Sequence, residues 1–222
     1  DAAPSFERMM MMTLAGLVGP VVLVYLDDVI VLGKDAENHL DNLRKVFVRL
    51  RESGLKLKLS KCTFMRKEIT YLGHLVTTDG IHMDPKKQNV IKDYPAPKDK
   101  DKLRSFMGLM SYYRSFIKNF SIVAEPLNKL LRKNVPYEWT EDQQNSFERL
   151  KTHLLEPPLL RYPDYDKVFF IATDASNTGL GASLMQESEG KLHPIAYASR
   201  TLNKSERNYS VTKREALAVV WG

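Results

Sequence analysis

Hydrophobic and polar positions follow two different periods along the chain, and these periods predict its helices and strands. Residues 4–15 carry helix formers and predict a helix. The runs Val21–Leu26 and Val29–Leu32 are almost wholly apolar and are separated only by Asp27 and Asp28. Two short apolar runs around two turn residues predict a β-hairpin whose strands are buried on both faces.

The next segment changes period twice. Ala36–Ser53 has apolar residues at spacings of three and four and is followed by Gly54, which predicts a helix with a glycine stop. Leu55–Leu59 alternates leucine with lysine and predicts a strand with one apolar face. Ile69–Thr77 is rich in β-branched and aromatic residues and predicts a further strand.

Helical spacing dominates the middle of the chain. Asp84–Asp93 predicts a short helix. An apolar stripe over Leu103–Ile117 predicts a long amphipathic helix, and Val123–Arg132 predicts another. Thr140 stands three residues before Gln143, a capping-box pattern that predicts the start of one more helix.

Strand patterns return near the end of the sequence. The runs VFFIATDAS (168–176), GLGASLMQE (179–187) and LHPIAYASR (192–200) predict three strands, the last two joined by a turn at Ser188–Gly190. A helix is expected to begin near Thr212. The pattern as a whole therefore predicts an α+β fold.

The distribution of charge along the chain indicates a class of binding partner. The net charge of +6 conceals a segregation, because residues 33–133 hold 22 Lys and Arg against 11 Asp and Glu, whereas the remainder holds 11 against 16. A basic middle between acidic ends favours a polyanionic partner such as nucleic acid. A solvated basic surface gives the same count, so charge alone leaves both interpretations open.

Two other classes of protein are excluded. Cys62 is the only cysteine, which rules out a disulfide scaffold and a multi-cysteine zinc site. Met9–Leu26 contains 18 uncharged residues, long enough to consider a membrane span. Gly16, Gly19 and Pro20 divide it into a helix-like half and a strand-like half, so no membrane span is expected.

Asp27 and Asp28 are the strongest chemical signal. Aspartate suits a tight turn, so a plain turn is one interpretation. Two like charges between buried strands repel each other, however, and Mg²⁺ removes that cost because carboxylates are its preferred ligands. Two such metals about 4 Å apart catalyse phosphoryl transfer in polymerases. Spacing alone leaves the turn and the metal site both open.

Longer motifs resemble one family. VLVYLDDVIVLG contains the Tyr-x-Asp-Asp hairpin of reverse transcriptases, and GLKLKLSKC, YLGHLVTTDGI and LRSFMGLMSYYRSFIKNFS resemble the palm and thumb of gypsy-type LTR retrotransposon Pol polyproteins. PYEWTEDQQNSFERLK, TDASNTGLGASL and HPIAYASRTLNKSERNYSVTKREALAVVWG are similar to that family's connection and RNase H segments. The resemblance covers essentially the whole chain, in the family's order.

The resemblance implies a multidomain α+β fold. Its parts are the C-terminal part of a polymerase palm with an antiparallel hairpin (1–80), a helical thumb-like region (81–135), a connection (136–163) and the N-terminal part of an RNase H-like α/β domain (164–222). It also implies RNA-directed DNA polymerase and RNase H activities in the cytoplasm, within a virus-like particle. The implied cofactor is Mg²⁺, and the implied partners are RNA template, DNA primer, RNA–DNA hybrid and dNTP.

The resemblance assigns four catalytic metal ligands. Asp27 and Asp28 serve the polymerase, and Asp174 and Glu215 serve the RNase H. Taken locally, Asp174 is equally a plain turn aspartate. Thr212 and Glu215 also form a capping-box pattern, which gives Glu215 a purely structural alternative.

Nucleic-acid contacts are implied for six further residues. Lys61 lies near the incoming nucleotide in this family, where it donates a proton to the leaving pyrophosphate, although a surface lysine is the alternative. Leu72, Gly73 and His74 align with the loop that grips the primer end, and Gly73 allows close backbone approach.

The other two residues lie beside the apolar stripe of the thumb-like helix. Tyr112 and Arg114 are placed to contact a nucleic-acid backbone. Tyr113 lies on the stripe itself and is expected in the core.

Both catalytic sites are expected to need residues outside this sequence. The palm requires a third carboxylate from a strand before Asp1, and the RNase H requires two aspartates after Gly222. DAAPSFER, at the start, resembles the family's nucleotide-binding motif with Pro4 one position later than usual. The fragment alone is therefore expected to be inactive. The alternative function is a non-catalytic nucleic-acid-binding remnant of a decayed retroelement.

Overall fold

The computed structural model describes the backbone of residues 2–222 and side chains from Pro4 onward. The chain divides into two compact units, one ending at Lys67 and one covering Glu68–Gly222. Asp1, the first residue of the DAAPSFER segment, lies outside the described residues.

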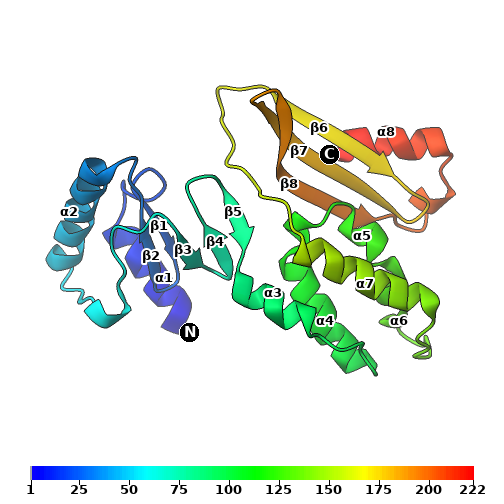
Figure 1. Ribbon diagram of the computed structural model, residues 1–222. Coiled ribbons are helices and arrows are strands. Elements are labelled where there is room, and N and C mark those ends of the chain that lie inside the picture. The colour runs from blue at the N-terminus through cyan, green and yellow to red at the C-terminus, as the bar shows by residue number, and fades with distance from the viewer. Residues whose placement is uncertain (1) are drawn as a thin grey trace. The chain divides into compact units, whose positions relative to one another are not determined.

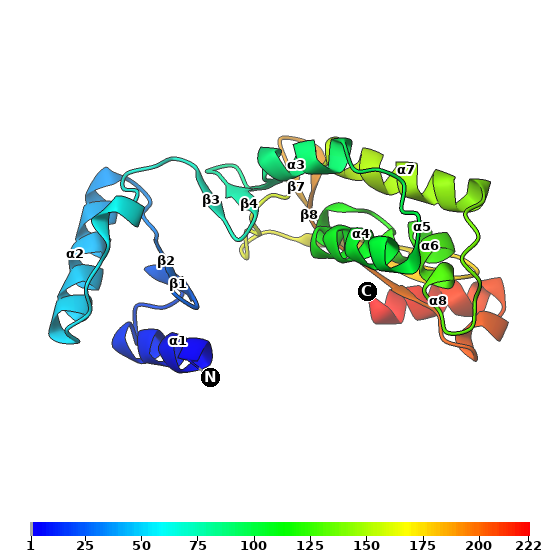
Figure 2. The ribbon, with the colours of Figure 1, turned by 90° about the horizontal axis from the view of Figure 1, so that it is seen from below.

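The first unit is a hairpin packed on two helices. Its elements are α1 (Ala2–Thr13), β1 (Val22–Tyr25), β2 (Asp28–Val31), α2 (Ala36–Glu52) and a 3₁₀ turn, η1 (Leu59–Lys61). Figure 2 shows α1 beside β1 and α2 beside β2. The core between them holds Met10, Leu14, Val22, Val46 and Leu50.

The hairpin differs from expectation in its loop and its burial. Tyr25 pairs with Asp28, so the two loop residues are Leu26 and Asp27 rather than both aspartates. Leu26 has φ 52°, a left-handed conformation that leucine rarely adopts. The predicted burial on both faces is wrong, because one layer of helices covers the Val22 face while Leu23 and Tyr25 on the other face are 41% and 47% exposed.

The strand predicted over Leu55–Leu59 is also wrong. Residues 55–58 have no regular structure, and Leu59 is 72% exposed. A strand needs a neighbour for its backbone hydrogen bonds, and no strand of residues 2–67 lies beside this segment. The prediction of α2 is confirmed, with Gly54 at φ 70° directly after its last turn.

The second unit begins with three short strands and continues with helices. β3 (Ile69–Tyr71), β4 (His74–Val76) and β5 (Ile81–Met83) form an antiparallel sheet. The helices that follow, seen together in Figure 2, are α3 (Pro85–Lys92), α4 (Lys100–Tyr112), α5 (Phe120–Val123), α6 (Glu125–Leu130) and α7 (Glu141–Leu155), with a 3₁₀ turn η2 (Arg114–Phe116) after α4.

Two predictions in this region need correction. Ile69–Thr77 is not one strand, because Leu72 and Gly73 both have positive φ and turn the chain between β3 and β4. The long helix over Leu103–Ile117 ends at Tyr112. The apolar stripe misled the prediction because Phe116 and Ile117 are buried although the α-helix has already ended.

The helix predicted over Val123–Arg132 is divided between α5 and α6. Pro126 stands in the first turn of α6 and has no N–H to continue a preceding helix, so the helix restarts at Glu125. The predicted helix start at Thr140 is confirmed, because the Gln143 side chain accepts a hydrogen bond from the Thr140 backbone N–H at 3.1 Å.

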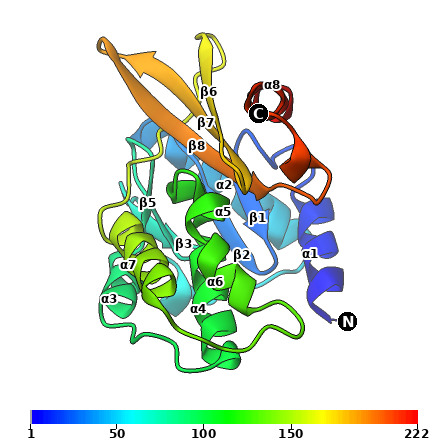
Figure 3. The same cartoon turned by 90° about the vertical axis from the view of Figure 1, so that its right-hand side faces the viewer.

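The C-terminal part is a three-stranded antiparallel sheet with one helix. β6 (Phe169–Ala175), β7 (Gly179–Ser188) and β8 (Lys191–Thr201) lie in the order β6-β7-β8, followed by a 3₁₀ turn η3 (Glu206–Asn208) and α8 (Val211–Trp221) (Figure 1). The three predicted strands and their turn are confirmed. Figure 3 shows α8 on one side of this sheet and α5 on the other.

The core of the second unit lies among the helices. It includes Phe106 and Phe147, whose ring centroids are 4.7 Å apart, and extends to Met83 and Leu160. No helix among residues 2–222 is long and apolar enough to cross a bilayer. The uncharged stretch Met9–Leu26 instead supplies parts of α1 and β1, as its glycines predicted.

Candidate functional site

The two aspartates of the first unit stand at the tip of the hairpin. Asp27 lies in the loop and Asp28 begins β2, and both side chains are exposed. The β1–β2 ladder holds the Asp28 backbone opposite Tyr25, and Asp27 precedes it in the loop. Lys61 lies in η1 of the same unit, also exposed, and no hydrogen bond or ion pair links it to either aspartate in the described structure.

The second unit brings four of the predicted nucleic-acid contacts together. The turn Leu72-Gly73 meets the end of α4, where the Tyr112 hydroxyl donates to the Leu72 carbonyl and the Tyr113 hydroxyl donates to the Gly73 carbonyl at 2.8 Å. The ring of His74 stacks on Tyr112 at 5.5 Å between centroids. We call this the turn–helix cluster: Leu72, Gly73, His74, Tyr112 and Tyr113.

Gly73 is required at its position in the cluster for two reasons. Its φ of 70° suits glycine, and a Cβ there would lie 3.0 Å from the Tyr113 hydroxyl oxygen. Tyr113 is buried, as predicted, but its hydrogen bond to the turn was not predicted because the apolar stripe indicated only packing.

Burial shifts two pKa values in the cluster. Desolvation lowers the pKa of His74, whose ring lies among Tyr112, Tyr113 and Phe116. Its Nδ1 is buried and has no hydrogen-bond partner among the described residues. Burial, with smaller contributions from Tyr112 and Asp84, raises the pKa of Tyr113 to about 12. Both groups are therefore held neutral near pH 7.

Arg114 lies outside this cluster. It begins η2 just after α4, and its side chain is exposed. No hydrogen bond or ion pair engages its guanidinium among the described residues, so it remains available to an anionic partner.

Asp174 lies near the end of β6 and is exposed. Asn119 Nδ2 donates a hydrogen bond to Asp174 Oδ2 at 2.7 Å. The sequence did not indicate this partner. Asp174 pairs with Gly181 on β7, so both lie on the face of the sheet that α5 covers.

Glu215 lies on α8 and is exposed. The capping-box alternative is wrong, because α8 begins at Val211 and the Ser210 side chain accepts from the Lys213 backbone N–H. Glu215 is therefore one turn inside the helix rather than at its start. The C-terminal end of α8 packs on the face bearing Thr173 and Ala182, opposite the Asp174 face.

Comparisons with known proteins match both parts of the chain. Residues 2–76 match the family described as reverse transcriptase (RNA-dependent DNA polymerase), and residues 139–222 match an RNase H-like domain found in reverse transcriptase. The chain is 45% identical, over 99% of its length, to the retrovirus-related Pol polyprotein from transposon 412 of Drosophila melanogaster. It is 38% identical over its whole length to the Pol polyprotein from transposon gypsy of the same organism.

The chain belongs to the gypsy/412-type LTR retrotransposon Pol family. It spans 18% and 22% of those two polyproteins, so it corresponds to about a fifth of a Pol relative. As a Pol region it contains the C-terminal part of a reverse transcriptase together with an RNase H-like domain, in a mixed α+β fold.

Solved structures agree with this Pol assignment. The foamy viral protease-reverse transcriptase in complex with RNA/DNA hybrid is 25% identical, with a TM-score of 0.82 over 100% of this chain and 30% of that one. The same viral protein in complex with dsDNA gives a TM-score of 0.80 over 99% of this chain and 47% of that one.

The donor chemistry of the Pol region fits Mg²⁺. Asp27, Asp28, Asp174 and Glu215 present exposed carboxylates, which are the oxygen ligands that Mg²⁺ prefers. No group of three or more potential metal ligands is gathered among the residues that the structure describes. The described residues therefore gather no complete metal site.

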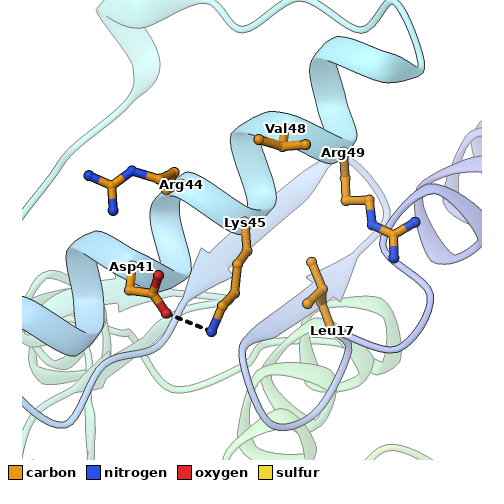
Figure 4. Close-up of a pocket in the computed structure, with 6 residues that line it drawn as sticks. All are labelled: Leu17, Asp41, Arg44, Lys45, Val48 and Arg49. Carbon is orange, nitrogen blue, oxygen red and sulfur yellow. Dashed lines mark ion pairs between the residues drawn. The ribbon is translucent and has the colours of Figure 1, made fainter.

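A hollow lies on the first unit. It has a volume of about 360 Å³ and is lined by Leu17, Asp41, Arg44, Lys45, Val48 and Arg49 (Figure 4). Asp41 and Lys45, one turn apart on α2, form an ion pair at 2.7 Å. Arg44 and Arg49 also line the hollow, so its lining carries an excess of positive charge. It contains none of the predicted site residues.

Proposed function

We propose that this Pol region is part of an RNA-directed DNA polymerase with RNase H activity, acting by two-metal phosphoryl transfer. The observation that carries the proposal is the exposed Asp27-Asp28 pair at the tip of the β1–β2 hairpin, within the segment that matches reverse transcriptases. The substrates are an RNA template, a DNA primer and dNTP for synthesis, and an RNA–DNA hybrid for cleavage. The location is the cytoplasm, within a virus-like particle.

In the polymerase part, Asp27 and Asp28 hold the catalytic Mg²⁺. The bound metal supplies charge stabilisation for the attacking and leaving oxygens of the phosphoryl transfer. The hairpin ladder presents both carboxylates from adjacent backbone positions, and their exposure leaves them accessible to metal and nucleotide. Lys61 carries an exposed ammonium and donates a proton to the leaving pyrophosphate.

The turn–helix cluster holds the primer end. Leu72, Gly73 and His74 form the turn that contacts the primer, and the hydroxyls of Tyr112 and Tyr113 fix the carbonyls of that turn. Neutral His74 gives the turn a flat stacking partner rather than a charge. Tyr112 is 52% exposed and, with Arg114, contacts the nucleic-acid backbone.

In the RNase H part, Asp174 and Glu215 hold the Mg²⁺ that serves RNA cleavage. Support comes from the match of residues 139–222 to an RNase H-like domain. α8 packs against β6, but on the face of the sheet opposite Asp174, so the packing itself does not join the two carboxylates. The proposed parts of the chain are the palm (1–80), the thumb-like region (81–135), the connection (136–163) and the RNase H-like part (164–222).

A separation of the two activities tests the proposal. In the full-length Pol protein, Asp27→Asn or Asp28→Asn removes the charge that holds Mg²⁺ but keeps the side-chain shape, so primer extension is lost and hybrid cleavage continues. Asp174→Asn has the reverse effect. Both assays are run with Mg²⁺ on purified protein, and circular dichroism checks that each variant is folded.

The matched control is Asp142→Asn, an exposed aspartate on α7 outside both sites, which leaves both activities unchanged. If Asp174→Asn stops DNA synthesis as completely as cleavage, the two-site assignment is wrong. If the wild-type Pol protein binds hybrid but performs neither reaction, the alternative function holds, namely a non-catalytic nucleic-acid-binding remnant.

A further inference from the structure

The side chain of Asn119 is directed at Asp174 instead of at its own helix. Asn119 stands at the N-cap of α5 with φ 58° and ψ 32°, and its carbonyl accepts from the backbone N–H groups of Ile122 and Val123. An asparagine at this position usually accepts from a helix N–H with its side chain. Here the side chain makes no such bond, and its Nδ2 donates to Asp174 Oδ2 at 2.7 Å.

This hydrogen bond is one of several contacts between residues 119–121 and a row of residues across the sheet. Asp174, Gly181 and Ser199 are direct neighbours on β6, β7 and β8, so they form one row on one face. At the far end of the row, Ser199 Oγ accepts from the Ser121 backbone N–H at 2.9 Å and donates to Ser121 Oγ at 3.1 Å. The segment from Asn119 to Ser121 thus contacts both ends of the row.

Gly181, in the middle of the row, leaves space for the side-chain amide of Asn119. A Cβ at Gly181 would lie 1.8 Å from Asn119 Oδ1 and 2.9 Å from Asn119 Cγ, far inside van der Waals contact. A side chain at position 181 therefore displaces the Asn119 amide from Asp174. The lack of a side chain serves close approach here, because φ of Gly181 is not in the left-handed region.

We propose that Asn119 is a positioning residue for Asp174 in the RNase H centre. The inference rests on the proposed function of Asp174 as a metal ligand. The Asn119 N–H holds Oδ2 and leaves Oδ1 open, and a carboxylate has enough lone pairs for both partners. Because the amide is neutral, it orients the carboxylate without cancelling the charge that attracts Mg²⁺.

The chain position of Asn119 gives this hydrogen bond a further meaning. Asn119 lies in the thumb-like region that we propose for residues 81–135, whereas Asp174 lies in the RNase H-like part. The polymerase side of the chain therefore supplies a residue that orients a nuclease carboxylate. Removing the amide loosens Asp174 without touching α8, which packs on the opposite face of the sheet.

The experiment uses two variants that remove the same hydrogen bond by different routes, in the full-length Pol protein. Asn119→Gly deletes the amide, and glycine readily adopts the positive φ. Gly181→Ala leaves Asn119 and Asp174 intact but displaces the amide. The control is Ser121→Ala, which removes the hydroxyl at the other end of the row and keeps its backbone bond to Ser199.

The first readout is Mn²⁺ binding followed by electron paramagnetic resonance, in an Asp27→Asn/Asp28→Asn background that removes the polymerase site. Asn119→Gly and Gly181→Ala each weaken binding by about tenfold to a hundredfold, the usual effect of removing a partner of a metal ligand. Their combination is no weaker than either alone, because both changes remove the same hydrogen bond. Ser121→Ala binds like the background protein.

The second readout is the Mg²⁺ concentration for half-maximal hybrid cleavage, which rises in both variants while cleavage at saturating Mg²⁺ recovers. Unchanged Mn²⁺ affinity in folded Asn119→Gly, or a lower Mg²⁺ requirement, overturns the inference. If Asn119→Gly does not fold, Gly181→Ala alone decides. If Asp174→Asn binds Mn²⁺ and cleaves like wild type, the proposed function of Asp174 fails instead, which is a separate outcome.

Discussion

At the scale of single residues, His74 shows how burial sets a charge state. Its ring lies between Tyr112 and Phe116, with the centroid of Phe116 at 5.6 Å and the edge of Tyr113 on a third side. An imidazolium in this position would lose hydration without gaining an acceptor, because Nδ1 has no hydrogen-bond partner in the part of the chain that the structure describes. The turn–helix cluster therefore depends on a neutral histidine.

This dependence predicts a loss of stability in acid. The folded-state pKa of His74 lies below its value in the unfolded chain, about 6.5, so the unfolded state binds the proton more readily. The contribution of His74 to the free energy of unfolding is therefore fully present above pH 6.5. It is lost progressively as the pH falls below 6.5. His74→Phe keeps a flat ring without a titrating group, so the decline of the urea midpoint between pH 7.5 and 5.5 becomes shallower.

His153 supplies the matched control for that measurement. Its pKa is also lowered, by burial and by Arg149, so it contributes a decline of the same sign from α7. His153→Leu removes that contribution and leaves the contribution of His74. A pH dependence in His74→Phe that equals wild type would contradict the burial argument for the cluster.

At the scale of elements, a capped helix start offers a direct test. Gln143 Oε1 accepts from the Thr140 backbone N–H at 3.1 Å and from its hydroxyl at 2.6 Å, at the start of α7. Thr140→Ala removes the hydroxyl and is expected to lower the free energy of unfolding by about 1 kcal/mol. Urea unfolding of the 222-residue chain measures the change.

Thr152→Ala is the control for this prediction. Thr152 is exposed in the last turns of the same helix, and replacing it with alanine slightly favours the helix by intrinsic propensity. The two variants make the same chemical change at two positions of one helix. If both change stability equally, the capping interactions at Thr140 contribute nothing measurable.

The elements also show which sequence signals were sufficient. The start of α7 and the strands β6–β8 were predicted because caps, alternation and turn glycines are local signals. Leu55–Leu59 alternates as cleanly but forms no strand, because strand formation depends on a partner elsewhere in the chain. The end of α4 at Tyr112 was missed because the buried stripe continues to Ile117 through a change of backbone conformation.

The residues of the candidate site likewise divide into those marked by local sequence motifs and those that depend on a distant partner. The carboxylates and the Leu72-Gly73-His74 turn were predicted from motifs, and the structure joins that turn to Tyr112. Asn119 was not predicted, because its partner Asp174 is 55 residues away and nothing local marks the pair. Gly181 was the one available signal, since a glycine inside a strand indicates close approach by another group.

At the scale of the whole molecule, the uneven charge distribution predicts how nucleic acid binds. The excess of positive charge lies in residues 33–133, and the backbone phosphates of a hybrid are its natural partners. Each neutralised phosphate releases bound counterions, so the affinity of the Pol protein for an RNA–DNA hybrid falls linearly on a logarithmic plot against salt. Fluorescence anisotropy over a series of salt concentrations measures the slope.

Paired neutralisations locate the source of that slope. Arg114→Gln with Lys118→Gln removes two exposed charges from the basic segment, whereas Lys191→Gln with Lys204→Gln removes two exposed charges from outside it. The first pair reduces the salt slope by about one for each phosphate that the protein no longer neutralises, equally for hybrids of different sequence. The second pair leaves the slope as in wild type, because those lysines lie in the acidic remainder of the chain. Equal effects from both pairs, or a flat salt dependence in wild type, would show that the basic segment does not carry the binding.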